Sequence, residues 1–400
     1  MSVQRKRRIF ICGDYKFPHG DATANRMQYI AQMITDMGME AALISVGDNR
    51  ADERDNAKNG YNHEGLFYTN VKRRPGNPYD FMLRAVRAGK ILNEQGIKDD
   101  DIVFISSVWP HYTWILRKTL QAKPHILFDV TEWFQPFQFR FGRFDFWYRS
   151  YNHYFTHTAM SGEKIIVISR ELENHYRKRG KPVFCLPFVL DPYKYPFAER
   201  RDHSKTRFIY PGNPGKKDSM RVMLKALELL TPEERKAIEF HITGVSRETI
   251  AAVLGREKEL LHAVDDIVRF HGWLEYAELY ELYNRMDFFL LAKEDNPVSR
   301  SNFPSKVPEL MSCGVIPVMN TIGDIGAYLT DGDDCLLFSE CTPESCVKGI
   351  REALLLEPQK IADMSRAARS CAAEKFNYRN WSEKTVRFMC GESYEFQRNS

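Results

Sequence analysis

The chain has 400 residues, a hydrophobic fraction of 43% and a net charge of +4 at pH 7. Its length predicts roughly two or three domains, and the mild positive charge excludes a protein dedicated to nucleic-acid binding. The eight cysteines form no CxxC pair, and no apolar run reaches the roughly 18 residues that span a membrane. We therefore expect a cytoplasmic protein that binds neither a metal ion nor nucleic acid.

Strand and helix patterns alternate along the first half of the chain. Short runs of β-branched and aromatic residues predict strands at 8–13, 41–47, 102–107, 125–130, 164–169 and 183–187. Between the first two, a predicted helix over 24–38 places Met27, Ile30, Ile34 and Met37 on one face. This alternation predicts a parallel sheet, and the nearly continuous apolar strands predict helices on both of its faces.

The second half repeats the alternation, with predicted strands at 207–212, 239–244, 267–272, 287–292, 315–320 and 335–338. A stretch rich in proline and charge at 191–207 separates the halves, and an amphipathic helix is predicted at 377–390. We predict Rossmann-like domains over 1–195 and 196–375, and a final helix within 376–400 that crosses back to the first domain. Such sheets bind ligands at the carboxyl ends of their strands, which predicts a site in the cleft between the domains.

The stretch YPGNPGKKD at 210–218 connects a predicted strand to a predicted helix. It is not a Walker A loop, because only two residues separate Gly212 from Gly215 and no hydroxyl residue follows Lys216. Backbone N–H groups and a helix dipole beside Lys216 and Lys217 can still hold an anion. The alternative is a solvated turn.

Several segments, in the same order, resemble the GT-B glycosyltransferases, most closely the retaining glycosyltransferase family 4, also called glycosyltransferases group 1. In the second half these are YPGNPGKKD, HITG (241–244), RFHGWLEYAELYELYNRMD (269–287), DFFLLAKEDNPVSRSNFPSKVPELMSCGVIPVMN (287–320) and IGDIGAYLTDGDDCLLF (322–338). In the first half, GDYKFPHGDATANRMQYIAQMITDMG (13–38) and KIIVISRELENHYRKRG (164–180) are similar to family elements. The resemblance implies an α/β fold of GT-B type, with two Rossmann-like domains whose parallel sheets face each other across a cleft. The first domain is then the acceptor side and the second the donor side.

The resemblance assigns the loop at 210–218 to the diphosphate of a nucleotide sugar. Lys217 matches the phosphate lysine of the family, and Lys216 is its neighbour. Asn213 stands where the family often has an arginine after the strand glycine, here Gly212, so Lys216 supplies the missing charge. A lysine is a compact point charge suited to a diphosphate.

Glu309 matches the second glutamate of the E-x7-E motif of the family, which accepts hydrogen bonds from the ribose hydroxyls. A carboxylate can accept two such bonds from a cis-diol. The alternative is an exposed helix residue. Ser301 stands where the first glutamate, which contacts the donor sugar, is usual. This departure leaves the identity of the sugar open.

The FPSK stretch just before Glu309 adds backbone groups. The amides of Asn302 and Phe303 are expected to bind sugar hydroxyls. Pro304 suits the first position of a helix, and the amides of Ser305 and Lys306 then point at an anion.

The base of the nucleotide is expected between two strand-ending glycines, Gly244 and Gly272, where the backbone can approach a ring closely. Trp273 either stacks on this base or packs against the protein. Nothing in the sequence separates uracil from guanine.

The acceptor side offers weaker candidates. Gly20 permits a close approach of the backbone, while Asp21 and Arg26 either bind polar groups or cap and decorate a helix. Asp129 and Glu132 follow a predicted strand and either contact the acceptor hydroxyl or make strand-end hydrogen bonds.

Twelve aromatic residues lie between Trp133 and Phe155, interleaved with arginines. Phe144, Trp147, Tyr151 and Tyr154 fall on one face of a predicted helix. Three interpretations remain open: ordinary helix packing, a surface for a lipid-linked acceptor at a membrane, and a partner interface.

The resemblance implies a retaining transferase that moves a sugar from a nucleotide diphosphate sugar, with UDP or GDP, to a carbohydrate or lipid-linked acceptor in surface polysaccharide synthesis. Its family chemistry uses no metal and no cofactor besides the donor, because the leaving diphosphate takes the acceptor proton. Lys217 and Glu309 then position the donor. Such an enzyme would be cytoplasmic, or peripheral at the inner face of the membrane. A sugar-nucleotide epimerase and a catalytically degenerate, nucleotide-sugar-binding subunit are the alternatives.

Overall fold

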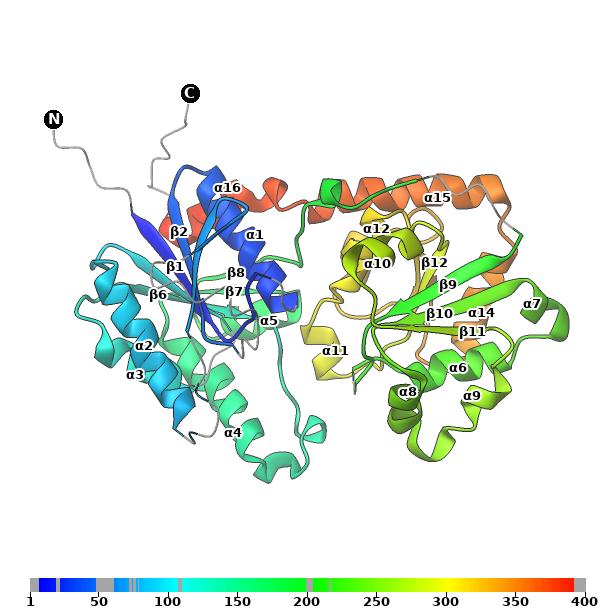
Figure 1. The fold of residues 1–400 in the computed structure, drawn as a ribbon, viewed down its shortest axis with the longest axis horizontal. Helices are drawn as coiled ribbons and strands as arrows, with labels where there is room; N and C mark the ends of the chain where they lie inside the picture. Colours follow the sequence, from blue (N-terminus) through cyan, green and yellow to red (C-terminus); the bar gives the residue numbers. More distant parts are fainter. Residues whose placement is uncertain are drawn as a thin grey trace. The chain divides into compact units, whose positions relative to one another are not determined.

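The computed structural model describes residues 7–18, 22–47, 61–71, 74, 77, 79–106, 110–198, 204–215 and 217–391. The chain forms two compact units (Figure 1). Unit 1 consists of Met1–Leu190 and Tyr378–Ser400, and unit 2 consists of Asp191–Asn377. Each unit is a sheet of mainly parallel strands covered by helices, so the predicted fold of two Rossmann-like domains is confirmed.

Unit 1 contains an eight-stranded sheet in the order β3-β4-β2-β1-β5-β6-β7-β8. Its strands are β1 (Arg8–Gly13), β2 (Glu40–Ser45), β3 (Tyr61–His63), β4 (Leu66–Asn70), β5 (Ile102–Ser106), β6 (His125–Val130), β7 (Lys164–Val167) and β8 (Val183–Cys185). Only the β3–β4 pair is antiparallel among these strands. The six strands predicted from this half are confirmed, while β3 and β4 lack the continuous apolar run that identified the others.

Helices cover both faces of this sheet. They are α1 (Ala22–Asp36), α2 (Asp80–Glu94), α3 (Pro110–Thr119), α4 (Phe146–His153), α5 (Arg170–Arg177) and α16 (Arg379–Cys390). Figure 1 shows α2 and α3 on one face and α1 with α16 on the other. Arg7 and Lys164 donate to the carbonyls of Cys390 and Phe388, at 3.1 and 2.7 Å. Cations at this end of α16 also complement the helix dipole.

Unit 2 contains a six-stranded, fully parallel sheet in the order β11-β10-β9-β12-β13-β14. Its strands are β9 (Thr206–Pro211), β10 (Ile238–Thr243), β11 (Val268–Gly272), β12 (Phe288–Leu291), β13 (Ile316–Asn320) and β14 (Leu336–Phe338). This is the doubly wound order, in which the chain changes direction between β9 and β12. The predicted strands of this half are confirmed, and the change of direction marks where a ligand is expected.

The helices of unit 2 again lie on two faces (Figure 1). They are α6 (Met220–Glu228), α7 (Pro232–Lys236), α8 (Arg247–Leu254), α9 (Leu260–Ala263), α10 (Tyr276–Tyr283), α11 (Pro297–Ser301), α12 (Lys306–Ser312), α13 (Ile325–Tyr328), α14 (Pro343–Leu354) and α15 (Pro358–Cys371). α6, α8 and α14 lie on one face, and α10 and α12 lie on the other.

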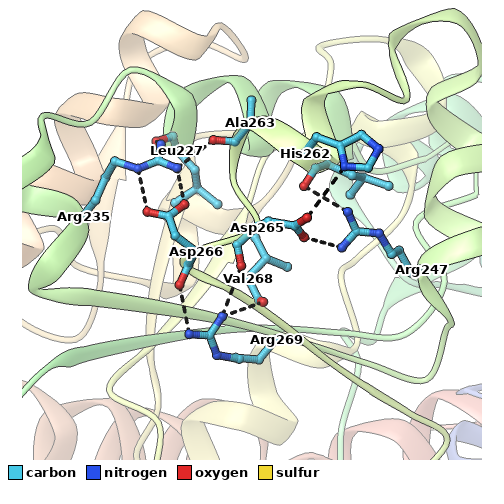
Figure 2. Close-up of polar contacts among 10 residues, drawn as sticks. Leu227, Arg235, Arg247, His262, Ala263, Asp265, Asp266, Val268 and Arg269 are labelled. Carbon is cyan, nitrogen blue, oxygen red and sulfur yellow. Dashed lines mark hydrogen bonds and ion pairs between the residues drawn. The ribbon is translucent and has the colours of Figure 1, made fainter.

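Three arginines fix the loop that leads into β11 (Figure 2). Arg235 pairs with Asp266, and Arg247 pairs with Asp265. Arg269 donates to the backbone carbonyls of Asp265 and Asp266, at 3.3 and 2.9 Å. The arginine contacts lower the pKa of both carboxyl groups. This cluster holds the amino end of β11. It therefore helps to fix the strand but lies away from the carboxyl end, where a ligand is expected.

A buried ion pair crosses the core of unit 1. Arg26 on α1 forms a salt bridge with Asp129 at the end of β6, at 2.9 Å, and neither residue is more than 1% exposed. Ser106 donates to the same carboxylate at 3.1 Å, and Arg26 also donates to the carbonyls of Leu186 and Pro187, both at 3.0 Å. Asp129 was predicted as a weak acceptor-side contact, but its oxygens are already engaged. The geometry favours the strand-end alternative, and Arg26 is a core residue rather than a cap.

We expect Asp129→Asn to lower the free energy of unfolding by about 3–5 kcal/mol, because it leaves the Arg26 guanidinium buried without a counter-charge. Urea denaturation of the parent and the variant measures this change. Glu383→Gln is the control, since it breaks the exposed pair with Arg387 and should cost less than about 1 kcal/mol. An Asp129→Asn variant as stable as the parent would contradict the structural role.

Candidate functional site

Three strands of unit 2 end in glycines with left-handed backbone conformations. Gly212, Gly244 and Gly272 follow or end β9, β10 and β11, with φ of 98°, 76° and 64°. Gly212 donates to the Thr243 carbonyl at 2.9 Å, and Gly244 donates to the Gly272 carbonyl at 2.6 Å. A Cβ added to Gly244 would lie 3.1 Å from the Gly212 Cα. The structure therefore brings the three predicted glycines together at the carboxyl ends of adjacent strands, where their backbones lie close to one another.

The loop that follows Gly212 is a compact turn. The Asn213 side chain accepts from the Gly215 amide at 2.9 Å, and the Lys217 amide donates to the Pro214 carbonyl at 3.1 Å. Asn213 therefore shapes the loop where the family would place an arginine. Lys217 is partly exposed at the end of this turn. Lys216 lies outside the described residues, so its predicted role stays a prediction.

A lysine that the sequence analysis did not single out anchors this loop. Lys293, only 3% exposed, follows β12 and donates to Asp218 at 2.8 Å. The Tyr210 hydroxyl donates to the other oxygen of Asp218 at 2.7 Å. Lys293 also exchanges two backbone hydrogen bonds with the Asn320 side chain at the end of β13. Its position directly after the apolar run DFFLLA was the available signal, because it put a charge at the carboxyl end of a predicted strand.

The segment after Lys293 corrects part of the predicted sugar contacts. Ser301 is fully buried, and its hydroxyl donates to the Val298 carbonyl at 3.1 Å. The Asn302 amide donates to the same carbonyl at 3.2 Å, so the predicted amide contact from Asn302 to a sugar is not available here. Phe303 is an anchor, with its ring centroid 5.5 Å from those of Tyr328 and Phe376.

Asn302 offers a different group instead of its amide. Its side-chain oxygen is buried and has no hydrogen-bond partner among the residues that the structure describes. A buried acceptor without a partner is costly, which makes it a candidate to receive a hydroxyl from a bound molecule.

The helix α12 begins at Lys306, so the prediction that Pro304 occupies its first turn is wrong. Pro304 lies in the preceding turn, where its carbonyl accepts from the Val307 amide at 3.0 Å. Ser305 is the N-cap residue and lends no side-chain hydrogen bond.

Lys306 and Glu309 lie side by side on α12, with Nζ and Oε2 3.3 Å apart. The Cε of Lys306 would be 3.8 Å from a Cβ added to Gly212. A lysine, a carboxylate and bare backbone therefore meet at the carboxyl end of β9. Glu309 is largely buried and also lies close enough to Tyr283 to add to the rise in its pKa, which burial mainly causes.

Trp273 follows β11 and is 78% exposed. This exposure does not favour the alternative in which the ring packs against the protein. The stacking role stays a prediction.

Unit 1 has a cavity of about 210 Å³ at the carboxyl ends of β1 and β6. Asp14, Glu132, Trp133, Phe134 and Tyr151 contribute to its wall. Burial raises the pKa of Tyr151, and the two carboxylates add to this rise. Glu132 therefore lines an acidic, aromatic cavity that suits uncharged hydroxylated molecules. The predicted candidates Gly20 and Asp21 lie outside the described residues.

The aromatic stretch does not form the single helical face that was predicted. Phe144 lies in a separate 3-10 turn before α4 and is 89% exposed, whereas Tyr154 is buried. The packing interpretation therefore holds for only part of the stretch.

Among the described residues, no group of three or more His, Cys, Asp or Glu side chains is placed to hold a metal ion. Within the same part of the chain, no helix has the length and apolar character needed to cross a membrane.

Residues 205–355 match the family model described as Glycosyl transferases group 1. This match confirms the resemblance to that group and covers most of unit 2. The finer assignment to family 4 and the retaining mechanism stay predictions. No curated protein sequence matches the chain.

Solved structures with the same fold cover nearly the whole chain. A glycosyltransferase from Rickettsia africae is 14% identical with a TM-score of 0.70, covering 99% of this chain and 100% of its own. Anabaena HepE in complex with UDP and glucose is 12% identical with a TM-score of 0.69, covering 95% and 98%. WaaG, a glycosyltransferase involved in lipopolysaccharide biosynthesis, is 13% identical with a TM-score of 0.67, covering 96% and 100%. At these identities the similarity supports the GT-B fold.

The close approach of Gly244 to Gly212 can be tested with a pair of glycine variants. Where UDP or GDP raises the melting temperature of the parent, we expect Gly244→Ala to abolish that rise, because the methyl group displaces the backbone of Gly212. Gly180→Ala is the control, because Gly180 has a similar positive φ of 72°, lies in unit 1 and has no atom within 4 Å of the added Cβ. It should cost about 1–2 kcal/mol of stability and leave the nucleotide response intact. Equal responses in both variants would show that this edge does not hold the nucleotide.

Proposed function

We propose that this chain, whose residues 205–355 match the glycosyl transferases group 1 family, transfers a sugar from a nucleotide diphosphate sugar to a carbohydrate or lipid-linked acceptor. The observation that carries the proposal is the meeting of Lys306, Glu309 and the Gly212 backbone at the carboxyl end of β9. Positive charge and open backbone suit a diphosphate, and a carboxylate next to them suits the ribose diol. The complex of Anabaena HepE with UDP and glucose supports a UDP-linked donor, and GDP is the alternative.

The donor would be held by groups of different chemistry. Lys217 and Lys306 supply charge to the diphosphate, with Lys216 as a further candidate. Glu309 binds the ribose, and the exposed ring of Trp273 is available to stack on the base. The buried side-chain oxygen of Asn302 is the proposed acceptor for a sugar hydroxyl, in place of the glutamate that Ser301 replaces.

We propose that transfer retains the anomeric configuration. The bond from the anomeric carbon to the diphosphate oxygen breaks, and the acceptor oxygen bonds to that carbon on the same face. The acceptor proton passes to the departing diphosphate, whose charge the lysines stabilise. This route needs positioning rather than a general base, and it requires no cofactor or metal ion.

Proton NMR of the product should show the anomeric configuration of the donor, and EDTA should leave the rate unchanged. An inverted product would contradict the same-face mechanism.

The cavity beside Glu132 in unit 1 is the proposed acceptor site, because carboxylates accept from sugar hydroxyls and aromatic rings stack on sugars. Its negative charge favours an uncharged terminal sugar over a phosphorylated one. The fold shared with WaaG supports a role in surface polysaccharide synthesis, at the cytoplasmic face of the membrane where a lipid-linked acceptor would be held. A nucleotide-sugar-binding subunit without turnover is the second candidate, because Ser301 supplies no carboxylate. A sugar-nucleotide epimerase would instead turn over the donor with no acceptor.

We expect Lys217→Ala to weaken UDP or GDP binding roughly tenfold to a hundredfold, since it removes a charged partner of the diphosphate. Uridine or guanosine binding should not change. Glu309→Ala should weaken nucleosides and nucleotides alike, because it removes the ribose contact. Isothermal titration calorimetry measures both series.

Lys236→Ala is the matched control, because it removes the same charge from an exposed position. Lys236 precedes the amino end of β10, whereas the proposed donor site lies at the carboxyl ends of the strands. It should bind nucleotides as the parent does. If Lys217→Ala and Glu309→Ala also bind like the parent, the donor site lies elsewhere.

A further inference from the structure

Five large aromatic side chains project into solvent from the turns before α4 and from its first residues. We name them the aromatic face: Phe137, Phe141, Phe144, Phe146 and Trp147, which are 52%, 66%, 89%, 60% and 46% exposed. Phe137 and Phe144 lie in two 3-10 turns, Pro136–Gln138 and Gly142–Phe144, and Phe141 directly precedes the second turn. Phe146 and Trp147 begin α4. These rings lie within eleven consecutive residues, and those of Phe146 and Trp147 are in contact, with centroids 5.6 Å apart. So many exposed rings in one short segment exceed the single apolar residues that are normal on a surface.

The segment is held so that these rings stay outside. Asp145 caps α4 by accepting from the Trp147 amide at 2.9 Å, and its other oxygen accepts from the Phe141 amide at 3.4 Å. Phe134 stacks on Tyr151 with ring centroids 4.3 Å apart. These contacts fix the backbone of the segment, so the exposed rings are held outside by a folded structure.

The charge of the same segment is positive. Arg140, Arg143 and Arg149 are exposed, and the single acidic residue between 133 and 153 is Asp145. Asp145 is 7% exposed and is used as the helix cap, so it offers little negative charge to a partner. An occupant of the aromatic face must therefore accept apolar rings and carry negative charge.

We propose that the aromatic face binds the surface of an anionic lipid bilayer. Aromatic rings settle at the boundary between headgroups and acyl chains, and arginines attract anionic headgroups. A bilayer meets both requirements over a wide area, whereas a protein partner would need matched acidic residues opposite each arginine. This proposal rests on the proposed function only where it takes the acceptor to be held in the membrane. The residues of the aromatic face all belong to unit 1 and are independent of the donor site.

Flotation with vesicles of phosphatidylcholine, alone or with 30% phosphatidylglycerol, tests the proposal. The parent should float with the anionic vesicles. With neutral vesicles it should stay unbound at the bottom of the gradient. Phe141→Ser/Phe144→Ser should reduce binding at least tenfold. Arg140→Gln/Arg143→Gln should reduce it by about fivefold per arginine and weaken its dependence on salt.

Tyr193→Ser/Leu355→Ser is the matched control, since it removes two exposed apolar side chains of unit 2, 69% and 82% exposed. It should bind vesicles like the parent. Unchanged melting temperatures would show that the aromatic-face variants fold. The UDP or GDP response of the same proteins tests the donor site separately, so loss of one readout does not imply loss of the other.

Failure of the parent to bind anionic vesicles would overturn the proposal, and so would equal binding by the Phe141→Ser/Phe144→Ser variant. If sedimentation velocity shows a dimer that this variant dissociates, and no vesicle binding occurs, the aromatic face is instead an interface between two copies of the chain.

Discussion

The ion pair between Lys293 and Asp218 connects the segments that follow β12 and β9 in unit 2, where these two strands diverge. These strands share only two register pairs, Phe208 with Phe288 and Ile209 with Phe289, so the ladder itself does not hold their carboxyl ends together. The ion pair and the hydrogen bond from the Ser219 amide to the Ala292 carbonyl, at 2.7 Å, take over this role. The loop that carries Lys217 starts from this closed end.

This arrangement fixes the turn that follows Gly212 and the start of α6 at the carboxyl ends of the central strands. Removing one partner of a buried ion pair leaves the other charge without compensation, which is far more costly than losing an exposed pair. Lys293 is therefore a positioning residue that keeps Asp218, and with it the proposed phosphate loop, in register with Gly212. A lysine buried for this purpose is unavailable to a ligand, which separates its role from those proposed for Lys217 and Lys306.

The two units differ in the charged residues at their strand ends. In unit 2 the edge combines lysines with open glycine backbone, whereas in unit 1 the cavity beside Tyr151 is lined by Asp14 and Glu132. A diphosphate would be favoured by the first environment and repelled by the second, whereas a neutral hydroxylated acceptor can bind beside the carboxylates of the second. The difference arises from which residues follow each strand, since both sheets have the same parallel architecture.

The sequence by itself determined most of the strands and the resemblance to group 1 glycosyltransferases. Every strand except β3 and β4 is a short apolar run, and such runs depend only on neighbouring residues. The order of the motifs likewise identified the group 1 resemblance. Tertiary structure alone decided which charges are buried, because the partners lie far apart along the chain: Arg26 and Asp129 are separated by 103 residues, and Lys293 and Asp218 by 75. It also decided which aromatic rings of 133–155 pack and which are exposed, since a regular pattern cannot show that Phe144 lies outside the helix. Local patterns report the periodicity of a segment, whereas burial depends on what the rest of the chain places against it.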